Sequence, residues 1–207
     1  MFAPPLARRR PTTVPVALHD GGTAEIRPLL PGERAPLVEV FAGLSPESRA
    51  SRYLVAMPRL SEAYLRALTA TEGSASLAWL ATVGDRPAGI GRYARMSEDP
   101  CAVDVALEVV DEHQHRGLGA VLLDAVTTLA AANGVRSLHA TVHPHNTASR
   151  RLLTRVGIPL ALEDGLLEGT APVRLLDPPR LDRHAVVDLA RRTSPTATDA
   201  LWTAPCA

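Results

Sequence analysis

The sequence predicts one mixed α/β (α+β) domain built on a single, mostly antiparallel sheet of about six to seven strands flanked by helices. Three observations favour this fold class. Short alternating or continuously apolar segments end at turn residues, other segments repeat apolar residues at helical spacing, and no segment is repeated along the chain. The resulting order is strand, helices, three strands, helix, strand, helix and one or two closing strands.

Composition indicates where the folded domain begins and ends. The chain has 207 residues, which suffices for one domain with extensions. Residues 1–22 contain four prolines, three consecutive arginines and a Gly-Gly pair, so we expect a flexible N-terminal arm. Residues 178–207 begin with two prolines, and we expect a largely flexible tail in which 182–192 could form a short helix. The folded domain is therefore expected at 23–177.

Charge and hydropathy exclude several classes of protein. The formal net charge is zero, so we expect no nucleic-acid or membrane-surface partner. No apolar run approaches the roughly 20 residues of a bilayer-spanning helix. The proline-rich start lacks the apolar stretch of a signal peptide, which predicts a cytoplasmic protein. Cys101 and Cys206 lie far apart and without metal-ligand spacing, so we expect no metal site.

The first half of the domain should contain one strand, then three helices, then a hairpin. Serine followed by Pro-Glu at Ser45 is a typical helix start, with the serine as cap, and Ser61-Glu62 is a second one. Gly84-Asp85-Arg86 predicts a tight turn between two strands. The expected elements are a strand at 23–29, helices at about 31–43, from 45 and at 61–69, and strands at 76–83 and 87–96.

The second half alternates strands and helices. Asn133-Gly134 and Gly157 are typical helix ends. The expected elements are strands at 102–110 and 137–142, helices at about 117–133 and 146–156, and one or two closing strands up to about 176.

The strongest local signal is the segment from Val109 to Ala120. An apolar strand runs into a loop that contains Gly117 and Gly119, and an amphipathic helix starts at once. Backbone N–H groups at a helix N-terminus have no intrahelical acceptor and carry partial positive charge. Glycines let a diphosphate approach these groups closely, and Arg116 adds a positive charge. The segment therefore predicts an anion-binding loop.

Two common types of glycine-rich phosphate loop do not fit this segment. A Walker loop requires a lysine after its glycines, and the chain contains no lysine. A dinucleotide fingerprint requires a third glycine and a strand-helix-strand unit near the N-terminus, and neither is present. A glycine-rich helix start without a ligand is the remaining alternative.

Two segments together resemble GNAT acyltransferases. Gln114-His115-Arg116-Gly117-Leu118-Gly119 resembles the Q/R-x-x-G-x-G/A motif that holds the CoA pyrophosphate in that family. Residues 146–158 resemble the family's N-x-x-[AS]-x-x-L-x-x-x-G-[FI] helix, and the two motifs are separated by a strand and a turn, as in the family. The resemblance covers about residues 23–177. It implies the GNAT fold and acetyl-CoA as co-substrate. The CoA-binding residues that it implies are Leu107, Val109, Val110, Gln114, His115, Arg116, Gly117, Leu118, Gly119, Ala120, Asn146 and Ser149.

The resemblance also implies which part of CoA each segment binds. The backbone of strand residues 107–110 would pair with the pantetheine and stabilise charge on the reacting carbonyl oxygen. The backbone N–H groups of residues 115–120 would hold the pyrophosphate.

A second resemblance lies upstream. FAGLSPESR at 41–49, followed by Arg52-Tyr53 and Leu60-Ser61-Glu62, is similar to a stretch of bacterial protein-lysine acetyltransferases. It implies a protein lysine as acceptor. Leu-Val-Ala follows Tyr53, where those enzymes tend to have aromatic residues, and two ordinary amphipathic helices are the alternative for this stretch.

Acylation of an amine requires a group that removes a proton from the ammonium. Alternation along strand 102–110 puts Asp104 and Glu108 on one face. Asp104 lies ten residues before Gln114, where the lysine acetyltransferases that the chain resembles place a catalytic glutamate. Glu108 is the rival, His143 is a further candidate base, and carboxylates that only face solvent or pair with arginine are the alternative.

The acid that protonates the departing thiolate is less defined. Many relatives place a tyrosine in the second motif's helix, and this chain has none there. Ser149 or a water molecule is therefore the candidate acid.

The sequence thus predicts an N-acetyltransferase that moves the acetyl group of acetyl-CoA to a primary amine by direct attack with general-base assistance. The first choice of acceptor is a protein lysine, and a small-molecule amine such as an antibiotic, polyamine or amino acid is the second. A non-catalytic acyl-CoA sensor is an alternative of another class. We expect a monomer or a homodimer.

Overall fold

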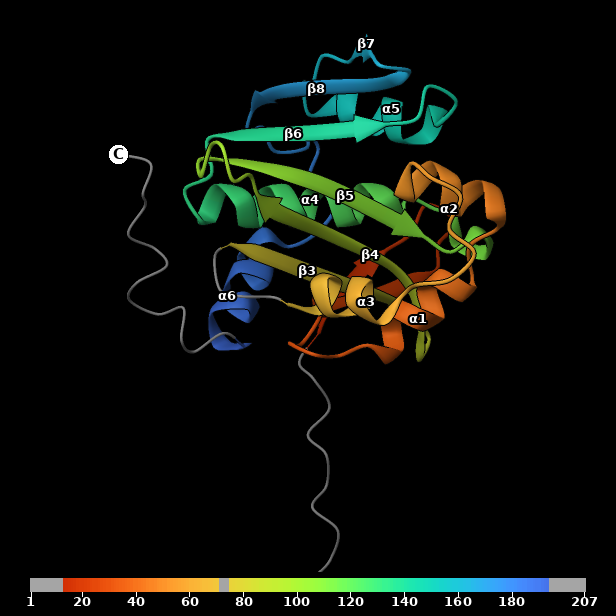
Figure 1. The fold of residues 1–207 in the computed structure, drawn as a ribbon. Helices are drawn as coiled ribbons and strands as arrows, with labels where there is room; N and C mark the ends of the chain where they lie inside the picture. The colour runs from red at the N-terminus through yellow and green to blue at the C-terminus, as the bar shows by residue number, and fades with distance from the viewer. Residues whose placement is uncertain (1–12, 71–74, 194–207) are drawn as a thin grey trace, which may run out of the picture.

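The computed structural model describes residues 13–70 and 75–193, which form one eight-stranded sheet with helices on both faces (Figure 1). The strand order is β1-β2-β3-β4-β5-β6-β8-β7, and all neighbours are antiparallel except the parallel pair β5 and β6. The strands are β1 (Val14–Ala17), β2 (Thr23–Pro28), β3 (Ser76–Val83), β4 (Arg86–Arg95), β5 (Ala102–Val109), β6 (Ser137–Val142), β7 (Ala161–Glu163) and β8 (Leu166–Pro172). This confirms the predicted fold class.

The helices form two layers. In Figure 1, α1, α2 and α3 lie in front of the sheet, while α4 and α6 lie behind it. The helices are α1 (Ala35–Ala42), α2 (Pro46–Tyr53), α3 (Glu62–Thr69), α4 (Leu118–Ala132), α5 (Thr147–Arg155) and α6 (Arg183–Thr193), with a 3₁₀ turn at Asp111–His113.

The middle parts of β3 and β4 are covered on both faces, which is why these segments are almost continuously apolar. Alternate residues of β3 show this division: Leu80 packs with α1 and α3, whereas Trp79 belongs to the core around α4. Helix α4 lies very close to β4, because a Cβ on Gly91 would be 3.1 Å from both Leu122 Cβ and Val126 Cγ2. The glycine of β4 therefore fixes the depth at which α4 sits.

Most predicted elements are present at or near their predicted bounds. Ser45 and Ser61 cap α2 and α3, since their hydroxyl oxygens accept the N–H of Ser48 and Tyr64, each at 3.1 Å. The hairpin turn pairs Val83 with Arg86. Strand β6 occupies 137–142, as the alternation predicts.

The folded region starts earlier than residue 23, the predicted boundary. Strand β1 pairs with β2, and the side chains of Val14, Val16 and Leu18 are buried in the core. The part of the expected arm before residue 13 lies outside the described residues.

The C-terminal boundary also shifts. Helix α6 forms at the predicted short helix and packs against α4, with Val186 and Leu189 buried. Residues 178–193 are therefore part of the folded unit, and 194–207 lie outside the described residues. None of the helices in the described ranges is long and apolar enough to cross a bilayer.

Candidate active site

The parallel strands β5 and β6 separate partway along their length, and this fork is the centre of the site. They are paired only from Ala102–Ser137 to Asp104–His139. Beyond that point each continues with another partner, β5 with β4 and β6 with β8. Figure 1 shows the two arrows diverging toward their C-terminal ends.

The fork leaves backbone groups of β5 without a strand partner. In an antiparallel ladder successive residues point their N–H and C=O alternately to one neighbour and to the other. Met96 N–H bonds to Ala102 C=O and Val110 N–H to Ala88 C=O, so the even-numbered residues of β5 face β4. Leu107 and Val109 consequently present their backbone to the fork. The Val109 C=O accepts the Gln114 side chain at 3.2 Å, which leaves the Val109 N–H and both groups of Leu107.

The loop before α4 presents a row of free N–H groups. Among the hydrogen bonds of the described residues, none is donated by the backbone N–H groups of residues 115–119. The loop holds this shape through two left-handed backbone conformations, at His115 (φ 61°) and Gly117 (φ 93°). Such a set of converging N–H groups at a helix start is an anion-binding arrangement.

A cleft of about 1040 Å³ joins the fork to this loop. Its walls come from α2, β5, the loop before α4, β6 and the start of α5. Sequence-predicted residues in its lining are Asp104, Leu107, Glu108, Val109, Gln114, His115, Gly117, Gly119, Ala120, Asn146 and Ser149. The topology therefore brings together two motifs that are separated in the sequence by helix α4 and strand β6.

Asp104 lies at the end of the paired part of β5 and β6, with His139 as its partner in the register. Its carboxyl lines the cleft and is accessible, and no hydrogen bond or ion pair holds it among the described residues. The cleft walls remove part of its water, and this partial burial raises the pKa of Asp104 above its usual value, against the opposing charges of His139 and Arg52. A carboxyl with a raised pKa is a stronger base than an ordinary aspartate.

Glu108 has a different environment. It is only 6% exposed, and its carboxylate accepts a hydrogen bond from the Tyr53 hydroxyl at 2.9 Å. The Arg52 Nε lies 3.6 Å from the same oxygen. Burial and the adjacent Glu108 charge raise the pKa of Tyr53, so this phenol remains a proton donor to Glu108. Glu108 is therefore a paired, buried group that links β5 to α2.

Comparison with known proteins identifies the family of this arrangement. The acetyltransferase (GNAT) family profile matches residues 42–158. An acetyltransferase of Pseudomonas aeruginosa is 33% identical over 148 residues, which cover 68% of this chain and 77% of that protein. The chain belongs to the GNAT acetyltransferase family. It is therefore an acetyl-CoA-dependent acetyltransferase.

Other GNAT proteins show the same fold. The GNAT domain of S. lividans PAT superposes with a TM-score of 0.72 at 28% identity, covering 77% of this chain and 96% of that one. A Salmonella typhimurium structure solved with acetyl-CoA has a TM-score of 0.60 at 17% identity, covering 75% and 97%, and resembles the chain in fold. The acetyltransferase Pat of Mycolicibacterium smegmatis is 28% identical over 155 residues; the match spans 74% of this chain but only 46% of Pat.

The geometry of the GNAT cleft fits its donor. The free N–H groups of residues 115–119 suit a diphosphate, and the fork offers the backbone of Leu107 and Val109 to an extended amide chain such as pantetheine. Among the described residues, no group of three or more His, Cys, Asp or Glu side chains is placed to hold a metal ion.

Three of the predicted CoA-binding residues, two of them apolar, are absent from the lining of the cleft: Val110, Arg116 and Leu118. Val110 does not face the fork: its N–H donates to the Ala88 C=O, its C=O accepts the His113 N–H, and its side chain is buried. The apolar pattern extends the strand to 110, whereas β5 ends at Val109 and the chain turns there. The Leu118 side chain is buried, while its backbone N–H belongs to the row of free N–H groups at residues 115–119.

The positive charge of Arg116, the third of these residues, is paired with a carboxylate. Its Nε lies 2.5 Å from Asp20 Oδ2 in the turn between β1 and β2, and its NH1 lies 2.8 Å from His113 Nδ1. The hydrogen bond from Arg116 lowers the pKa of Asp20, so this pair stays ionised. Arg116 therefore fastens the loop to the first hairpin of the sheet.

Three other predicted residues organise the site. The Gln114 side chain donates to the Val109 C=O, to Asp111 and to Ser48, and so links the end of β5 to the loop and to α2. Asn146 caps α5, where its side chain accepts the Ser149 N–H at 3.0 Å. The cap places Ser149 in the first turn of α5, at the cleft wall.

Two features of the site are not among the sequence-based predictions. His19 lines the cleft, and its Nε2 lies 2.8 Å from where a Cβ on Gly117 would stand. The alternating Val14, Val16 and Leu18 could have indicated that the strand leading to His19 was part of the fold. The pairing of Tyr53 with Glu108 joins residues 55 positions apart, and no sequence pattern indicates it.

Proposed function

We propose that this acetyltransferase acts on the lysine side chains of proteins. The observation that carries the proposal is the position of α2. The GLSPESR segment resembles a stretch of bacterial protein-lysine acetyltransferases, and its helix α2 supplies one wall of the cleft, including Glu47, Ser48 and Arg52. The part of the chain with this resemblance therefore adjoins the position where an acceptor would enter.

The charges in the cleft suit a cationic acceptor. Glu47 at its rim and Asp104 in its wall are carboxylates without an ion-pair partner among the described residues. An approaching ammonium is attracted by them. We assign the role of general base to Asp104, which takes a proton from the ammonium either directly or through a water molecule.

The remaining roles follow from the backbone and from α5. Bound acetyl-CoA supplies the activated acetyl thioester. In this proposal the N–H groups of Leu107 and Val109, which face the fork, stabilise negative charge on the carbonyl oxygen when the amine nitrogen attacks. Ser149 at the start of α5, or a water molecule, donates the proton that the departing sulfur needs. Neither step requires a covalent intermediate on the enzyme.

The test compares acceptors under one set of conditions. Purified protein and acetyl-CoA are incubated with folded proteins, lysine peptides, free lysine and small amines, and thiol release is followed. We expect the highest kcat/KM with a protein. Because the chain contains no lysine, labelled acetyl groups found on protein lysines belong to the acceptor. A small amine that is acetylated faster than every protein would contradict the proposal and favour a small-molecule acetyltransferase.

The cytoplasmic location and the monomeric or homodimeric state remain predictions. Size-exclusion chromatography with light scattering measures the oligomeric state.

A further inference from the structure

We propose that Arg180, in the segment between β8 and α6, is a phosphate ligand for the 3′-phospho-ADP end of the CoA donor. The inference rests on the acetyl-CoA dependence of the family and not on the identity of the acceptor. It assigns a binding role to a segment that lies outside the expected catalytic domain and outside the matched residues 42–158.

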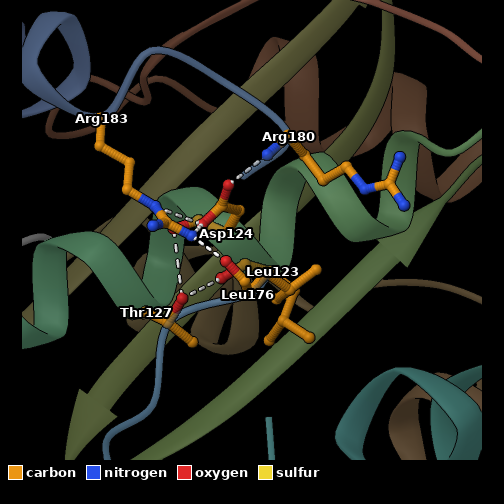
Figure 2. A network of polar contacts seen from close by, with 6 residues as sticks. All are labelled: Leu123, Asp124, Thr127, Leu176, Arg180 and Arg183. Atoms are coloured by element: carbon orange, nitrogen blue, oxygen red, sulfur yellow. Dashed lines mark hydrogen bonds and ion pairs between the residues drawn. The ribbon is translucent and has the colours of Figure 1, made fainter. Parts of the chain in front are cut away.

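A buried carboxylate fixes the position of Arg180. Asp124, in the second turn of α4, has no solvent exposure. One of its oxygens accepts the Arg180 backbone N–H at 2.6 Å, and the other accepts the Arg183 guanidinium at 2.6 and 2.8 Å. Arg183 also donates to the Leu176 C=O. Figure 2 shows the Arg180 backbone and the Arg183 guanidinium converging on Asp124. The backbone at residue 180 is thus held against α4 whatever side chain it carries.

The Arg180 side chain extends toward the anion-binding loop. In Figure 2 it points away from Asp124, on the side opposite to Arg183. Its NH1 lies 3.3 Å from His19 Nε2, and that same ring lies against Gly117. The backbone N–H of His19 also donates to the backbone C=O of Arg116 at 2.9 Å. The His19 side chain therefore lies between the Arg180 guanidinium and Gly117, where α4 begins.

The charge of Arg180 is uncompensated, unlike that of its neighbour. Arg116 is paired with Asp20, whereas Arg180 has no carboxylate partner within 13–70 and 75–193. Its only side-chain hydrogen-bond contact there is the imidazole nitrogen of His19, and its Nε is buried with no hydrogen-bond acceptor. An arginine held in this way retains donors for an anion.

The donor supplies more negative charge than the loop can accept. CoA carries a diphosphate and a separate 3′-phosphate. The free N–H groups of residues 115–119 are enough for the diphosphate, but they form one compact cluster. A second phosphate needs its own cation, and the planar guanidinium suits phosphate oxygens.

The experiment measures affinity by calorimetry, so it does not depend on turnover. CoA and 3′-dephospho-CoA are titrated into the wild-type chain, R180Q, R180K and R86Q. Arg86 is an exposed arginine of the β3–β4 hairpin that pairs with Glu39, and it controls for the loss of one positive charge. R180Q keeps the backbone N–H that bonds to Asp124, so we expect its melting temperature to match that of the wild type.

We expect R180Q to bind CoA about ten- to a hundredfold more weakly, with R180K in between and R86Q unchanged. If dephospho-CoA binds R180Q and the wild type equally, the contact is to the 3′-phosphate. An equal loss for both ligands places it at the diphosphate. R180Q with wild-type affinity for CoA overturns the proposal.

Discussion

Two carboxylates on the same strand show how local surroundings assign different roles to similar side chains. Asp104 is accessible, has no partner among the described residues and has a raised pKa. Glu108 is buried and already occupied by Tyr53 and Arg52. The strand period predicts that both lie on one face, but it cannot rank them, because the two partners of Glu108 come from α2, about 55 residues earlier in the chain.

Replacement of Asp104 by asparagine should abolish most activity without weakening the fold. Loss of a general base costs about a hundred- to ten-thousandfold in kcat, while CoA affinity should be unchanged. Because the pKa of Asp104 is raised in the folded state, its favourable contribution to stability is present below the usual aspartate pKa and is lost as the pH rises through the raised value. D104N is therefore expected to melt no lower than the wild type at pH 7.

The pH profile gives an independent check on Asp104. The acid limb of kcat/KM should lie above the usual range of an aspartate and should disappear from the residual activity of D104N. Wild-type turnover in D104N at every pH would remove Asp104 from the mechanism.

Glu108→Gln should act mainly on stability. The glutamine can still accept the Tyr53 hydrogen bond, but the partly buried Arg52 loses the negative charge near its Nε. We expect about 1–3 kcal/mol of lost unfolding free energy in urea titrations, and about 1 kcal/mol for Tyr53→Phe. If E108Q were as stable as the wild type but lost turnover as D104N is expected to, the base would be Glu108.

At the level of elements, the loop before α4 requires a glycine at position 117 but tolerates a small side chain at position 119. Alanine at 117 would have to adopt a φ of 93° and would place its Cβ 2.8 Å from the His19 ring. We expect G117A to lose about 1–3 kcal/mol of stability and much of its CoA affinity. Alanine at 119 would meet only the flexible Leu152 side chain, at 3.2 Å, so G119A is the matched control and should fold and bind normally.

Gly119→Asp separates folding from binding in the same loop. Its carboxylate would stand among N–H groups that are proposed to hold the diphosphate, so we expect a normal melting temperature and no measurable CoA binding. Unchanged affinity by calorimetry would show that the diphosphate binds elsewhere.

The elements are predictable where local chemistry decides them. The serine caps of α2 and α3, the hairpin turn after β3 and the alternation of β6 are all local signals. Strand β1 is not predicted, because the prolines of residues 1–22 obscure the period-two pattern at Val14, Val16 and Leu18. The contact of His19 with Gly117 joins residues 98 positions apart in the chain, and no local signal encodes it.

At the level of the whole molecule, Asp124 joins the C-terminal segment to the core. It is fully buried in α4 and accepts three hydrogen bonds from residues 180 and 183. D124A would leave the Arg183 charge without its partner, so we expect a loss of about 3–5 kcal/mol in urea unfolding. The exposed pair of Arg34 and Glu62 is the control, since R34Q should change stability by less than about 1 kcal/mol. A loss no greater than that of R34Q would show that α6 is not anchored through Asp124.

The fork between β5 and β6 has a consequence for solubility. Beyond Asp104, the side of β5 that faces β6 has no strand partner, as at the edge of a sheet. Such unpaired edges can recruit strands from other molecules. On the β5 side, Leu107 and Val109 present the free backbone groups, and α2 and α5 stand on either side of the cleft. A bound donor whose pantetheine pairs with these groups would cover the edge. We therefore expect light scattering to show less self-association of the protein with acetyl-CoA than without it.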